Sequence, residues 1–100
     1  MATATVTFIG PFVDAVPLPG FPPGTRRFWR FTSPMFDFTV VTATAQPFSQ
    51  GGASTSKNWE VIATSRRVVD PGAVQSFEVI VRNNGPNPSN YMMFLSLVGP

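Results

Sequence analysis

Histidine and cysteine are both absent from this 100-residue chain, and charged residues make up only 12% of it. Without cysteine there is no disulfide, thiolate nucleophile or thiolate-bound metal, and without histidine the commonest general base is missing. The carboxylates show no calcium-loop spacing, and they are scattered over the sequence at Asp14, Asp37, Glu60, Asp70 and Glu78. We therefore expect no catalytic residues, no metal site, no cofactor and no enzymatic activity.

The net charge is also small, at +2, and Lys57 is the only lysine. Nucleic-acid-binding proteins concentrate Lys and Arg on one face, because affinity grows with each phosphate that is neutralised. Nucleic acid is therefore not an expected partner. No apolar run approaches the eighteen residues of a membrane span, and no basic residue precedes an apolar stretch at the N-terminus as in an export signal. The sequence gives no indication of cellular location.

The chain instead reads as a series of short strands. Residues 3–9 alternate threonine with apolar residues, which predicts a half-buried strand with Ala4, Val6 and Phe8 facing the core. Residues 25–32 and 36–45 predict two more strands. In the latter the apolar residues change parity at Val40, which is typical of a β-bulge.

Between the first two strands, residues 10–24 carry five prolines and three glycines together with large apolar residues. Proline removes backbone donors, so this segment predicts an ordered Pro-rich loop or edge arm pinned by its apolar side chains. Residues 46–56, rich in Gly and Ser, predict a flexible loop.

The last forty residues predict three successive strands at 59–64, 74–82 and 90–98, separated by turns at 70–72 and 83–88. The final strand is apolar at both parities, unlike its neighbours. Such a strand is either central and covered on both faces, or it lies at a subunit interface.

No segment shows helical spacing of apolar residues over ten positions. Six or seven short strands with Pro and Gly turns predict an all-β protein: one antiparallel β-sandwich domain over residues 1–100, immunoglobulin-like or jelly-roll. Strand existence does not give strand order, so both topologies stay open. Ten Phe and two Trp provide the core.

Residues 70–72 (Asp-Pro-Gly) lead into the alternating strand at 77–82 and then into the Asn-Asn-Gly-Pro of residues 83–86. In this respect residues 59–98 resemble the immunoglobulin-like repeat domains of bacterial cell-surface proteins. The resemblance implies an adhesive or spacer role and brings no catalytic residues.

Two functions are compatible with these observations. The first is a non-catalytic structural or protein-interaction module that binds itself or another protein, with interface candidates Phe12, Phe21, Tyr91, Met92, Phe94 and Val98. The alternative is a carbohydrate-binding module or lectin, in which arginines and exposed aromatic rings bind a glycan. Its ligand-binding candidates are Arg26, Trp29, Arg30 and Trp59. For Trp29 and Trp59 the simpler interpretation, which the sequence favours, is that they belong to the core.

Overall fold

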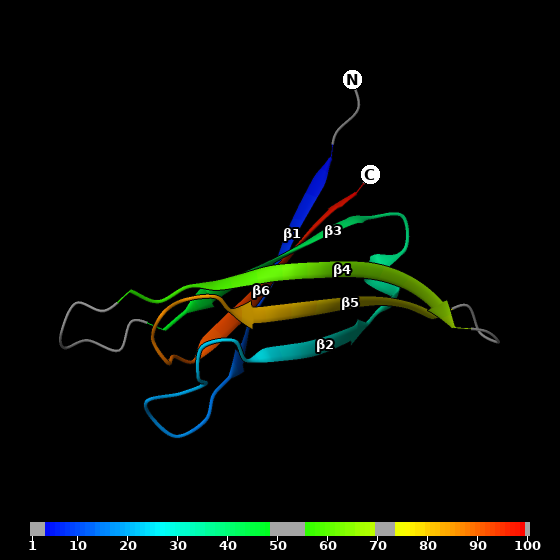
Figure 1. Cartoon of the computed structure of the whole chain (residues 1–100). Helices are drawn as coiled ribbons and strands as arrows, with labels where there is room; N and C mark the ends of the chain where they lie inside the picture. The colour runs from blue at the N-terminus through cyan, green and yellow to red at the C-terminus, as the bar shows by residue number, and fades with distance from the viewer. Residues whose placement is uncertain (1–3, 49–55, 70–73, 100) are drawn as a thin grey trace.

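The structure is a computed structural model that describes residues 4–48, 56–69 and 74–99. Within these residues the chain forms six strands and one turn of 3₁₀-helix (Figure 1). In chain order they are β1 (Thr5–Asp14), β2 (Arg26–Thr32), η1 (Pro34–Phe36), β3 (Val40–Pro47), β4 (Trp59–Val69), β5 (Val74–Asn83) and β6 (Tyr91–Gly99).

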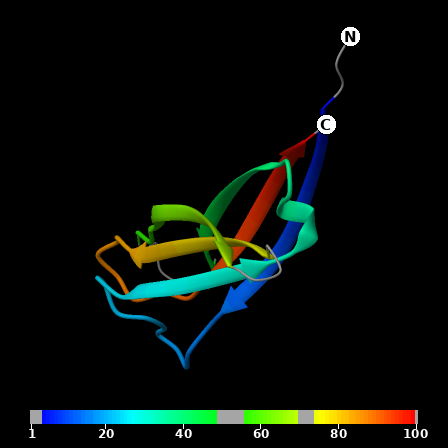
Figure 2. The ribbon, with the colours of Figure 1, turned by 90° about the vertical axis from the view of Figure 1, so that its right-hand side faces the viewer.

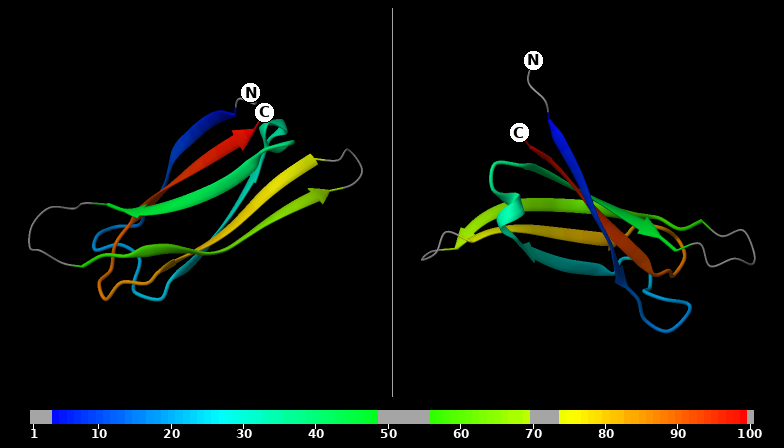
Figure 3. Two further views of the ribbon diagram at one scale, coloured as in Figure 1. Left: turned by 90° about the horizontal axis from the view of Figure 1, so that it is seen from above. Right: turned by 180° about the vertical axis from the view of Figure 1, so that it is seen from behind.

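The strands form two antiparallel sheets of three, in the orders β1-β6-β3 and β2-β5-β4. The sheets face each other as two layers, seen from above in Figure 3. The predicted all-β sandwich is therefore confirmed. In an immunoglobulin sandwich the first two strands are neighbours in one sheet, whereas here β1 and β2 belong to different sheets. The chain doubles back, pairing β1 with β6 and β2 with β5, which is the winding of a jelly roll.

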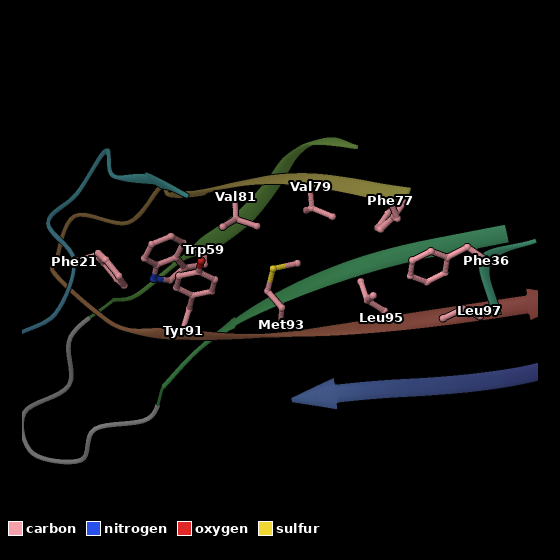
Figure 4. Packing of buried hydrophobic residues seen from close by; sticks show 10 residues of the cluster. All are labelled: Phe21, Phe36, Trp59, Phe77, Val79, Val81, Tyr91, Met93, Leu95 and Leu97. Carbon is pink, nitrogen blue, oxygen red and sulfur yellow. The ribbon is translucent and has the colours of Figure 1, made fainter. Parts of the chain in front are cut away.

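The core lies between the two central strands (Figure 4). Alternate residues of β6, from Tyr91 to Leu97, point at alternate residues of β5, from Phe77 to Val81, and all of them are buried. Trp59 stacks on Tyr91 at one end, with ring centroids 3.9 Å apart, and Phe36 of η1 closes the other end. A strand period of two places the odd residues of both strands on the inner faces.

Strand β1 departs from the sequence prediction in its length and its phase. It continues to Asp14, through Gly10 and Pro11, because a register shift between Ile9 and Phe12 accommodates these two residues opposite Phe94. The prediction that Val6 and Phe8 face the core was wrong. They pair with Val98 and Ser96, so they lie on the outer face of the sheet. Pairing with β6, not the amphipathic pattern of β1 itself, sets which side is inward.

The prediction of a strand from residue 36 was also wrong, since residues 36–39 form the end of η1 and a turn and do not pair in a sheet. Ser33 caps η1, its side chain accepting a hydrogen bond from the Met35 N–H at 3.1 Å, and Phe38 adopts a left-handed backbone conformation with φ 59°. Strand β3 begins at Val40, so the change of apolar parity marks the start of a strand and not a bulge within one.

The remaining predicted strands are present, and β4 is longer than expected, with a register shift between Val61 and Ala63. In the Pro-rich segment, Phe21 is buried and exchanges two backbone hydrogen bonds of 3.1 Å with Ser89. Gly20 allows this approach, because a Cβ there would come within 2.6 Å of the Ser89 carbonyl carbon. The predicted turn at 70–72 and most of the predicted loop at 46–56 lie outside the described residues.

Candidate interaction surface

The outer face of the β1-β6-β3 sheet is largely apolar. The even residues of β6 point outward, and register places Val6 and Phe8 of β1 and Val40 of β3 on the same side. Phe8 is 75% exposed and Val40 66% exposed. The face as a whole consists of Val6, Phe8 and Val13 from β1, Met92, Phe94, Ser96 and Val98 from β6, and Val40, Thr42, Thr44 and Gln46 from β3. We call this set the apolar face.

No charged side chain lies on the apolar face. In the three strands of its sheet the single charged residue is Asp14, which pairs in register with the buried Tyr91 and so points inward. The strands of the other sheet hold eight charged residues, namely Arg26, Arg27, Arg30, Glu60, Arg66, Arg67, Glu78 and Arg82. Among the residues of the six strands, charge is therefore confined to one of the two layers, with Asp14 as the exception.

The outer face of the second sheet shows what the charged layer looks like. Arg30 forms an ion pair with Glu78 at 3.2 Å and lies over the ring of Phe28, with 5.8 Å from its guanidinium carbon to the ring centroid. In the register of the strands, Arg26 of β2 lies opposite Arg82 of β5, and Arg82 lies opposite Glu60 of β4. A small hollow of about 90 Å³ beside Phe28 and Ile80 contains one carboxylate, that of Glu78.

A polar network crosses the interior at the end of the sandwich near the Pro-rich segment. The Trp29 indole N–H donates to the Tyr91 hydroxyl at 2.7 Å, and that hydroxyl donates to Asp14 at 2.8 Å. Arg27 donates to the same carboxylate oxygen at 2.7 Å. Burial is the main cause that raises the pKa of Tyr91 above its ordinary value. These side chains connect the two sheets, and the Arg27 side chain, 47% exposed, forms the outer end of the network.

A larger hollow of about 360 Å³ opens on the inner side of β1 and β6, next to η1. Its lining includes Met35, Phe38 and Leu97, three threonines and a single charged group, Asp37. Across residues 4–48, 56–69 and 74–99, no three His, Cys, Asp or Glu side chains lie close enough together to hold a metal ion. Within the same residues, no helix has the length and apolar character needed to cross a membrane.

The structure divides the predicted interface residues into two groups. Met92, Phe94 and Val98 lie on the apolar face, with Val98 38% exposed. Tyr91 and Phe21 were misplaced by the sequence interpretation, because both are buried in the core, and Phe12 points inward onto Trp29 and Phe31. Phe94 is half-buried because its ring covers Gly10 of the neighbouring strand.

The predicted ligand-binding residues do not come together. Trp59 is 4% exposed and its indole N–H donates to Ser89 at 2.9 Å, while Trp29 faces the interior. Arg26 and Arg30 lie on the outer face of the charged sheet, whereas Trp29 lies on the inner face of the same strand. Sequence reasoning missed Val6, Phe8 and Val40 as surface residues, although the lack of charge in their strands was a readable signal.

No family model matches this chain, and neither a curated protein nor a solved structure matches it. The resemblance of residues 59–98 to immunoglobulin-like repeat domains therefore stays a prediction.

Proposed function

We propose that this protein is a non-catalytic structural or protein-interaction module that assembles with itself, or docks on a larger assembly, through the apolar face. The observation that carries the proposal is that one entire outer sheet face holds seven apolar side chains and no charge. Large contiguous apolar patches are rare on monomeric proteins and mark surfaces that another molecule covers.

The apolar face resembles the central part of a protein interface in composition. Interface cores are depleted of charged residues and enriched in aromatic residues and methionine, and here Phe8, Phe94 and Met92 are accompanied by valines and by hydroxyl side chains. Thr42 and Ser96 hydrogen-bond to each other across β3 and β6. Covering the face would therefore leave this pair of hydroxyls with a partner and would bury no charge.

Size sets a limit on what the apolar face can do alone. Three strands of about nine residues have a flat footprint of roughly 400 Å², whereas a stable interface buries about 800 Å² on each partner. The apolar face alone is thus suited to a weak complex, and a stable assembly needs a second contact as well.

The test is the solution mass by light scattering after size exclusion, over a series of protein concentrations. We expect a multiple of 10.8 kDa for the wild type, a return to the monomer mass for Phe8→Asp, and no change for the control Phe28→Asp. Phe28 is 57% exposed on the opposite sheet and also lies in an edge strand, so the two substitutions differ mainly in the face that they charge.

A wild-type protein that stays monomeric at every concentration would contradict self-assembly. Docking on another protein would be contradicted as well if that monomer bound no apolar fluorescent dye, or if it still bound the dye after the substitution Phe8→Asp. The carbohydrate-binding alternative has no specific observation in its favour here, because Trp29 and Trp59 both face the interior.

A further inference from the structure

Each sheet has two edge strands, and three of the four edges carry features that block pairing with another strand. Charged side chains, bulges and neighbouring segments are the usual ways in which proteins protect an edge. Strand β2 carries three arginines, and β4 carries Glu60, Arg66 and Arg67 together with its register shift. Strand β3 is uncharged, but it lies close to β4 along one side of the sandwich.

Within the part of the chain that the structure describes, the first half of β1 has none of these protections. Residues 5–9 contain no charge, no proline and no glycine, and they lie in register with β6 on one side only. This part of β1 rises away from the β2-β5-β4 sheet (Figure 2). Its free edge therefore presents backbone donors and acceptors that a further strand could pair with.

We propose that two copies of this chain join through residues 5–9 of β1, paired antiparallel about Thr7, so that their β1-β6-β3 sheets become one continuous six-stranded sheet. The inference rests on the proposed function, and it names the partner as a second copy and the contact as the edge of β1. It supplies the second contact that the footprint of the apolar face calls for.

The side chains of β1 suit this self-pairing. In a register centred on Thr7, Val6 of each copy lies opposite Phe8 of the other copy, which gives two equivalent pairs on the outer face. Aromatic and β-branched residues are favourable cross-strand neighbours, and Phe8 is the more exposed of the two residues at present. Thr5 then lies opposite Ile9 on the inner face, and no like charges meet anywhere along the pairing.

The bulge at Gly10 and Pro11 sets where the pairing stops. Gly10 has φ 130° and Pro11 has no backbone N–H, so the free edge loses its regular pattern directly after Ile9. Five residues from each copy can pair. Because this is a short edge, we expect an association that depends on concentration in the micromolar range or above, not a permanent dimer.

A single cysteine tests the arrangement, since the chain has none of its own. Residues directly opposite each other in antiparallel strands have Cα atoms about 4.5–5.5 Å apart, which is within the range of a disulfide. Thr7→Cys should therefore give a reducible covalent dimer under mild oxidation. Ser96→Cys is the matched control, because Ser96 lies in the middle of the apolar face, away from the β1 edge.

The outcomes separate this inference from the proposed function. Cross-linking at position 7 and not at position 96 supports the edge dimer. If Ser96→Cys instead cross-links through a bismaleimide long enough to span two stacked sheets, about 10 Å apart, the edge pairing is overturned while assembly through the apolar face stands. An oligomer that cross-links at neither position also overturns it. A monomer with no cross-link overturns both the edge dimer and self-assembly through the apolar face, and leaves docking on another protein to the dye-binding test.

Amide hydrogen exchange on the wild type gives a second readout that needs no substitution. Pairing at the edge should slow exchange of residues 5–9 as protein concentration rises, while β2, the edge strand of the other sheet, stays unchanged. Exchange of residues 5–9 that is independent of concentration, in a sample shown to be dimeric, would exclude the edge.

Discussion

Tyr91 links polar side chains of the two sheets through its hydroxyl group. It is fully buried, it stacks on Trp59, and its hydroxyl accepts from Trp29 of the opposite sheet while donating to Asp14 of its own sheet. Removing the hydroxyl leaves an indole N–H and a carboxylate oxygen each short of one partner. A buried group without its partner costs about 1–3 kcal/mol, so we expect Tyr91→Phe to lower the unfolding free energy by that amount near neutral pH.

The same residue should make stability depend on alkaline pH. Because burial raises the pKa of Tyr91 in the folded state, the unfolded chain loses the tyrosine proton first, near the ordinary pKa of about 10. The contribution is thus complete below about pH 10 and is lost as pH rises further, by up to about 1.4 kcal/mol per pH unit.

Urea unfolding at about pH 8 and about pH 11 measures this loss, with Tyr91→Phe as the control. The difference in stability between the two proteins should shrink at the higher pH. Tyr91 is the only tyrosine, so the ultraviolet absorbance of the phenolate reports its ionisation directly. A phenolate signal that appears near pH 10 in the folded protein would contradict the prediction.

At Asn83 the sequence predicts the turn but not the tertiary hydrogen bond that its side chain makes. The sequence indicates a turn at 83–86, and the turn is present. The Asn83 side chain, however, is buried: its amide donates to the carbonyls of Phe21 and Asn87, and its oxygen accepts from the Gly85 N–H. The bond to Phe21 spans 62 residues, and no local pattern reveals a contact at that separation.

We expect Asn83→Ala to destabilise the fold by about 2–4 kcal/mol, since three hydrogen-bond partners lose their contact at once. Asn84→Ala is the matched control, because the Asn84 side chain is exposed, and it should change stability by no more than about 0.5 kcal/mol. Chemical denaturation of both variants measures the difference. Equal effects would show that the Asn83 side chain adds nothing beyond the turn.

At the level of elements, β1 shows where sequence reasoning ends. Alternation within residues 3–9 correctly predicts a strand, yet the phase is reversed in the structure, because Thr7 and Ile9 pair with the inward-facing Leu97 and Leu95. When both faces of a sheet can carry apolar residues, the period of two alone does not choose the buried face. The candidate site was partly hidden for this reason: Val6 and Phe8 belong to it but read as core residues.

The bulge in β1 depends on Gly10. A Cβ at this position would come within 2.8 Å of the Met93 carbonyl oxygen, and the backbone has φ 130°. We expect Gly10→Ala to cost about 2–4 kcal/mol, whereas Gly24→Ala, which also has a positive φ but nothing within 4 Å of its Cβ, should cost about 1–2 kcal/mol. Thermal and chemical unfolding of the two variants separates close contact from backbone strain. Equal losses would mean that the contact with β6 is not what requires glycine.

At the level of the whole molecule, the distribution of charge was readable in the sequence but its arrangement was not. Residues 26–30 and 60–82 hold most of the charged groups, and residues 4–13 and 40–48 hold none. Only the strand order β1-β6-β3 shows that the uncharged segments share a sheet. Strand order arises from pairings between distant segments, and such pairings leave little trace in a single sequence.

This separation of charge predicts how assembly responds to salt. Contacts between charged groups weaken as ionic strength rises, since the Debye length falls from about 10 Å at 0.1 M to about 3 Å at 1 M, whereas apolar and backbone contacts are not screened in this way. An oligomer formed by the β1-β6-β3 sheet should therefore keep its mass between about 0.1 M and about 1 M sodium chloride. The double substitution of Arg26 and Arg30 by Glu, on the other sheet, should leave that mass unchanged. Dissociation at high salt, or upon this double substitution, would place the contact on the charged sheet, because the apolar face carries no group that salt can screen.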